Sequence, residues 1–162
     1  NASLAAYNFS GDRDAEYMFT TMTSDIRVSC LNDVLTDKAA RALKSPVYRY
    51  VVTSNPSKPI RPLGNKFRSK YAFHAWDAVA FFDHLDETFP DGPANSDVEF
   101  RNNLQEEIMT FVKTGKPFNR DWQPYPNHTA LISDKITFTD RFNKAQCEFW
   151  EAHDMLSYAW LN

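Results

Sequence analysis

The chain has 162 residues, of which 43% are hydrophobic, and its formal net charge is −3. This length and composition suit one compact domain, or one large piece of a bigger domain. The charges are spread without a basic face, which argues against a nucleic-acid partner, and no run approaches the ~18 apolar residues of a membrane span.

Two helices and a strand are expected in the first third of the chain. Apolar residues recur at three- and four-residue steps between residues 14 and 28, where Asp12 or Asp14 could cap an amphipathic helix. The same spacing resumes after Cys30 and ends at Ser45-Pro46, which predicts a second helix. The run VYRYVVTS at 47–54 is typical of a strand covered on both faces in a parallel sheet. Helix followed by buried strand predicts an α/β fold.

A proline-rich, basic segment at 55–71 predicts a loop, either simply solvated or forming a basic rim that steers anionic substrates. A short helix (77–85) and a turn-rich connector ending in Ser96 as a cap should follow. The stripe from Asp97 to Lys113 predicts a helix that Gly115 ends. Two short strands at 129–133 and 135–139 predict a hairpin, and a last helix is expected from Arg141 to Tyr158.

Among the four histidines, His74 has the most suggestive position. It follows the predicted strand by a loop and precedes a helix, where a histidine is placed to act as a base in an α/β sheet. The alternative is a polar residue at the start of an apolar helix, because His74 has no visible partner. The other histidines fit helix or surface positions, and no ligand spacing predicts a metal site. A G-x-S-x-G serine elbow is missing from the sequence.

The two cysteines, Cys30 and Cys147, fit no CxxC pattern and are either two free thiols or one long-range bridge. Glycosylation sequons begin at Asn1, Asn8 and Asn127. These sequons favour a secreted protein, and an oxidising compartment would favour a disulfide between the two cysteines.

Five segments, in order, resemble the C-terminal portion of the cholinesterase/carboxylesterase group (type-B carboxylesterases) of α/β-hydrolases. Cys30 follows a helix, and VYRYVV resembles the late sheet strand of the family. FHAWDAVAFF at 73–82 resembles its His-Gly-x-Glu block. MTFVKTGKPFNRDWQPY at 109–125 resembles F-x-K-T-G-x-P-N…W-P-x-Y, and QCEFW at 146–150 resembles the terminal Q-C-x-F-W. The resemblance covers roughly Ile26 to Trp150.

The resemblance implies the C-terminal part of an α/β-hydrolase fold, with late sheet strands and packing helices. Residues 1–162 would be part of one domain without an internal boundary, completed by an N-terminal chain or segment. His74 matches the triad histidine, and Asp77 matches the carboxylate behind it, although the family has Glu there and glycine at Ala75. Cys30 and Cys147 match a family disulfide. Trp76 would either wall a substrate pocket or pack beneath the site.

The implied function is hydrolysis of small-molecule carboxylic esters by a secreted serine hydrolase without a cofactor. In the family the serine and the acid precede the histidine, so both would lie on an N-terminal chain of the same precursor, and this chain alone would be inert. Its location would be extracellular or in the lumen of the secretory pathway. The alternative is a noncatalytic cholinesterase-like adhesion or binding protein, and the residue at the upstream serine position discriminates between the two.

Overall fold

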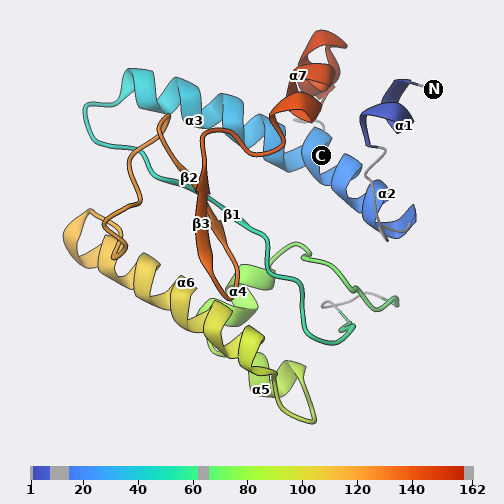
Figure 1. Cartoon of the computed structure of the whole chain (residues 1–162), viewed down its shortest axis with the longest axis vertical. Coiled ribbons are helices and arrows are strands. Elements are labelled where there is room, and N and C mark those ends of the chain that lie inside the picture. The colour runs from blue at the N-terminus through green and yellow to red at the C-terminus, as the bar shows by residue number, and fades with distance from the viewer. Residues whose placement is uncertain (1, 8–14, 62–65, 159–162) are drawn as a thin grey trace. The chain divides into compact units, whose positions relative to one another are not determined.

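The computed structural model describes residues 2–7, 15–61 and 66–158 (Figure 1). The predicted caps Asp12 and Asp14 lie outside these ranges. In chain order the elements are α1 (Ala2–Ala6), α2 (Ala15–Ser24), the π-helix η1 (Asp25–Ser29), α3 (Cys30–Ala42), β1 (Arg49–Val52), α4 (Trp76–Phe81), α5 (Leu85–Thr88), α6 (Asn95–Thr114), β2 (Thr129–Ile132), β3 (Ile136–Thr139), α7 (Lys144–Ala152) and the 3₁₀ helix η2 (Met155–Tyr158).

These elements form two compact units. The first unit comprises Asn1–Arg49, Pro124–Asn127 and Asp140–Asn162, and the second comprises Tyr50–Gln123 and His128–Thr139. The boundary therefore falls inside β1. That residues 1–162 form one part of a single domain stays a prediction.

In the first unit, α2, η1 and α3 make one continuous helical rod (Figure 1). The sequence pattern predicts two separate helices that meet near Cys30, whereas η1 joins α2 to α3 without a break. The Cys30 N–H donates to the carbonyl of Asp25, five residues earlier, which is the π-helical pattern. Because this wider turn keeps the backbone hydrogen bonded, the helix continues through the predicted break and ends where Leu43 becomes extended.

A disulfide joins Cys30 of α3 to Cys147 of α7, which confirms the predicted pairing. Both cysteines are fully buried. The predicted last helix is shorter than expected, because Asn143 (φ 49°) and Asp154 (φ 54°) adopt left-handed conformations on either side of α7. The disulfide therefore anchors a helix of only nine residues to the long rod.

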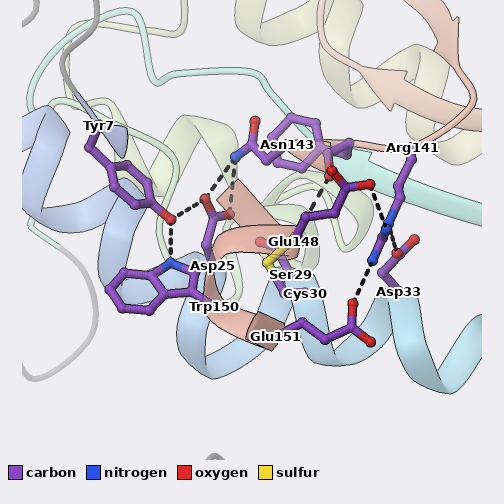
Figure 2. The surroundings of a disulfide bond; sticks show 12 residues. Tyr7, Asp25, Ser29, Cys30, Asp33, Arg141, Asn143, Glu148, Trp150 and Glu151 are labelled. Carbon is purple, nitrogen blue, oxygen red and sulfur yellow. Dashed lines mark hydrogen bonds and ion pairs between the residues drawn. A yellow bond between two sulfur atoms is a disulfide. The ribbon is translucent and has the colours of Figure 1, made fainter. Parts of the chain in front are cut away.

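A buried polar network lies beside the disulfide (Figure 2). The Tyr7 hydroxyl donates to Asp25 Oδ2 at 2.9 Å and accepts from Trp150 Nε1 at 2.7 Å. The Asn143 amide donates to both oxygens of Asp25 at 3.0 Å. Burial raises the pKa of the Asp25 carboxyl above its ordinary value, and it also raises the pKa of Tyr7. This network satisfies polar groups that would otherwise destabilise the core of the first unit.

The Asp33 carboxylate pairs with two arginines in the same unit. Arg49 Nη1 lies 3.2 Å from Asp33 Oδ1, and the Arg141 Nε donates to Asp33 Oδ2. The Arg49 guanidinium also donates to the Ser29 carbonyl at 2.9 Å. Asp33 and Arg49 are only 2% and 6% exposed, so this pair is removed from water. Burial lowers the pKa of Arg49, and the charge of Asp33 opposes that effect.

The sheet is a small mixed one with strand order β1-β2-β3. β2 and β3 form an antiparallel hairpin from Thr129↔Thr139 to Ile132↔Ile136, which confirms the predicted hairpin. The prediction that β1 is covered on both faces is wrong for the described residues, since Tyr50 is 37% exposed. Along β1, Arg49 is buried, Tyr50 is exposed, and Val51 and Val52 are partly buried.

Helix α6 packs against α4 in the second unit and carries much of its core. It starts at Asn95, and Asp97 rather than Ser96 stabilises the start, because its carboxylate accepts from the Ala94 N–H at 3.0 Å. Asp97 also accepts from the Ser57 N–H at 3.0 Å. Gly115, at φ 73°, ends the helix as predicted.

Candidate functional site

His74 lies in a tight turn just before α4. The Trp76 N–H donates to the Phe73 carbonyl at 3.1 Å and closes the turn around His74 and Ala75. Ala75 adopts φ 68° and ψ 14°, close to the third position of a type II turn, which favours glycine. The His74 side chain is exposed. The turn thus presents an imidazole at the surface immediately before a helix that is anchored in the core.

Asp77 is held by a residue that the sequence analysis missed. The Tyr50 hydroxyl of β1 donates to Asp77 Oδ2 at 3.2 Å, and the Ala78 N–H donates to Asp77 Oδ1 at 2.9 Å. Burial, together with the negative charge of Asp77 and this hydrogen bond, raises the pKa of Tyr50 to about 12. No local motif marks Tyr50, because its partner lies 27 positions away. Within the described residues, Asp77 makes no hydrogen bond to His74.

Trp76 lies in the core of the second unit. Its side chain is fully buried, and its ring stacks on Phe100 at a centroid distance of 5.8 Å and meets Phe89 edge-on at 6.2 Å. Its Nε1 has no hydrogen-bond partner within the described part of the chain. Of the two roles considered for Trp76, the structure therefore shows packing beneath the histidine turn, and Trp76 does not line the groove described next.

A groove of about 920 Å³ opens beside His74. Its lining comes from residues 58–61, Arg68, the histidine turn, Val79 of α4, and α5 with the residues around it. His84 Nδ1 lies 2.7 Å from Glu87 Oε2 at this surface. His84 was expected to be a helix residue, but it precedes α5 and shares the groove with His74. The groove therefore holds two imidazoles, one paired with a carboxylate and one exposed without such a pair in the described ranges.

Of the three asparagines predicted as glycosylation sites, one lies within the described residues. Asn127 is exposed, as an acceptor must be, whereas Asn1 and Asn8 lie outside the described residues. In the described ranges, no three His, Cys, Asp or Glu side chains gather closely enough to hold a metal ion. No helix there has both the length and the apolar character to cross a bilayer.

Chemically, an exposed imidazole beside a groove can exchange a proton with a group that enters the groove. Among the residues that the structure describes, no serine hydroxyl forms a hydrogen bond with His74. No protein-family model matches the chain, and no curated protein matches it.

Proposed function

We propose that this chain is the C-terminal part of a secreted type-B carboxylesterase of the α/β-hydrolase fold. In this proposal His74 is the general base for a serine nucleophile and is oriented by an acid. Both of these residues lie on an N-terminal chain or segment of the same precursor. The substrate is a small-molecule carboxylic ester, and the chain by itself is inert. The observation that carries the proposal is the exposed His74 imidazole in a fixed turn beside the groove of about 920 Å³.

The proposed chemistry is proton transfer in two directions. The His74 imidazole accepts the proton of the serine hydroxyl while the serine oxygen attacks the ester carbonyl carbon, and His74 then returns that proton to the leaving alcohol. Water hydrolyses the resulting acyl-serine by the same route, again with His74 as the proton carrier. The acid partner holds the imidazole in the required tautomer. Asp77 lies in the first turn of α4 and accepts a hydrogen bond from Tyr50.

Exposed apolar side chains support the proposed N-terminal partner. Phe67, Phe82 and Val112 of the second unit are 83%, 67% and 71% exposed. Phe19 of the first unit is 64% exposed. A partner chain would cover side chains of this kind where they adjoin one another in a patch, which is the usual mark of an interface. The disulfide between Cys30 and Cys147 fits the proposed passage through the secretory pathway.

The test starts from the protein as it is secreted, purified without reductant together with any chain that accompanies it. A fluorophosphonate probe should label a serine on the accompanying or preceding segment, whose mass and N-terminal sequence are then determined. His74→Gln should abolish labelling and lower kcat/KM for a simple ester by about a thousandfold or more. His153→Gln, an exposed histidine of the first unit, should leave both unchanged.

The outcomes separate the two functions considered. If no associated polypeptide is labelled, the esterase proposal falls, and the noncatalytic binding protein takes its place. If labelling occurs and survives His74→Gln, the serine is real but His74 is not its base. His84→Gln adds a second comparison, because this histidine lines the same groove but is paired with Glu87. The His84→Gln variant should lose less than about tenfold of the ester hydrolysis activity.

A further inference from the structure

Arg61 and Arg68 flank a backbone bridge between the two segments that carry them. The Ile60 N–H donates to the Ser69 carbonyl at 3.0 Å, and the Ser69 N–H donates to the Ile60 carbonyl at 2.7 Å. Arg61 follows Ile60, Arg68 precedes Ser69, and both arginines line the groove beside His74. Arg61 and Arg68 thus each adjoin the bridge on one of its two segments, and both present a guanidinium group to the same groove.

The two acidic residues that line the groove are paired with residues other than Arg61 and Arg68. Glu87 pairs with His84 at 2.7 Å, and Asp91 lies 3.8 Å from the ammonium of Lys58. Neither Arg61 nor Arg68 forms an ion pair with a carboxylate within the described ranges. Two guanidinium groups that line one groove repel each other because both carry positive charge. An anion between the two guanidinium groups removes that repulsion, and a carboxylate matches their planar N–H donors.

The rest of the lining is largely apolar. Phe73, Val79 and Phe89 face the same groove, whose volume of about 920 Å³ is that of a site for a small organic molecule rather than for a bare ion. We propose that this groove binds an organic anion. Its carboxylate lies at the Arg61–Arg68 pair, and its apolar body extends toward His74 along the apolar floor, which is formed by Phe73, Val79 and Phe89. As a statement about substrate, this inference rests on the proposed function: the ester that His74 serves would carry a carboxylate in addition to the scissile ester bond.

Binding of matched probes tests the inference without any need for catalysis. The purified protein, with any chain that accompanies it, is titrated calorimetrically at low ionic strength with 4-phenylbutyrate and with the neutral 4-phenylbutyramide. The carboxylate should bind about tenfold tighter or better, because two charge-assisted contacts are available to it and not to the amide. Raising the salt concentration should weaken the binding of 4-phenylbutyrate and leave the affinity for 4-phenylbutyramide unchanged. Equal affinity for the two probes at low salt would overturn the proposal.

Variants then locate the site. In the double variant Arg61→Gln with Arg68→Gln, the dissociation constants of 4-phenylbutyrate and 4-phenylbutyramide should lie within about twofold of each other. The matched control is Lys113→Gln with Arg120→Gln, which removes the same charge from exposed residues outside the groove and should preserve the preference. Loss of the preference in both double variants would show a nonspecific charge effect and would refute the site. Displacement of 4-phenylbutyrate by equal concentrations of inorganic phosphate would refute the role of the apolar floor.

The same preparation separates this inference from the proposed function. If 4-phenylbutyrate is preferred but no serine takes the fluorophosphonate, the anion site stands and the esterase proposal falls. If a serine is labelled but the carboxylate shows no preference, the esterase proposal stands and the anion site falls. Reversal of the pair to Arg61→Glu with Arg68→Glu should switch the preference to 4-phenylbutylamine, and failure to switch would count against the Arg61–Arg68 site.

Discussion

The hydroxyl of Tyr50 on β1 donates a hydrogen bond to the carboxylate of Asp77 at 3.2 Å and ties the strand to the beginning of α4. Because α4 follows the His74 turn directly, this bond restrains the segment on which the imidazole is carried. The Tyr50 hydroxyl thus anchors the first turn of α4, and it forms no hydrogen bond with His74 within the described residues.

Tyr50→Phe should lower the free energy of unfolding by about 0.5–1.5 kcal/mol at pH 8, the usual net contribution of one hydrogen bond. The folded-state pKa of Tyr50 is raised to about 12 from an ordinary value of 10.0. The stabilisation is therefore complete below pH 10 and is lost as the pH rises through the folded-state value. Urea unfolding of the wild type and the variant at pH 8 and near pH 12 measures this. A difference between the two proteins that does not shrink at high pH would contradict the assignment.

A double-mutant cycle isolates the same hydrogen bond. Tyr50→Phe, Asp77→Ala and the double variant should give a coupling energy of about 0.5–1.5 kcal/mol at pH 8. Independent effects of the two changes would show that the pair contributes nothing beyond packing.

Substitutions at Ala75 should test the backbone of the histidine turn. Ala75 is at φ 68°, where a Cβ costs roughly 1 kcal/mol, so Ala75→Gly should be neutral or stabilise by up to about 1 kcal/mol. Ala78→Gly, within α4, should instead destabilise by about 1 kcal/mol because glycine is unfavourable inside a helix. Thermal unfolding compares the two variants, and effects of the same sign and size would contradict the left-handed assignment.

Removal of the disulfide should destabilise the first unit more than the second. Cys30→Ala with Cys147→Ala releases a constraint on a sequence separation of 117 residues and should cost about 2–5 kcal/mol. Amide hydrogen exchange should accelerate in α3 and α7 and change less in α6. Thiol titration of the unreduced, denatured wild type is the control and should find no free thiol among Cys30 and Cys147.

Loss of the Asp33 carboxylate should be among the most damaging single changes. Asp33→Asn removes the carboxylate charge that pairs with the buried Arg49, and we expect a loss of about 3–5 kcal/mol in urea unfolding. Asp37→Asn removes an acid of the same helix that pairs with the exposed Arg41, and it should cost less than about 1 kcal/mol. Similar losses for the two variants would show that burial of the Asp33–Arg49 pair does not matter.

Local sequence patterns determined several features of this protein. The two short strand-like runs on either side of Asp134 predicted the hairpin, and the apolar stripe ending at Gly115 predicted α6, because both patterns depend on residues close together in the chain. The pairing of Cys30 with Cys147 came from the family resemblance rather than from spacing, and the structure contains it. His74 was selected by its place between strand and helix, and it does lie in an exposed turn there.

Only the tertiary structure decided how the site is assembled. Tyr50 meets Asp77 across 27 positions, and Arg141 reaches Asp33 across 108. The bridge between Ile60 and Ser69 joins the segments that carry Arg61 and Arg68, and the burial of Trp76 removes it from the groove. No periodicity or motif encodes these relationships, because they depend on how distant segments pack. The sequence by itself located the histidine, whereas packing determined which charges, hydroxyls and apolar surfaces surround it.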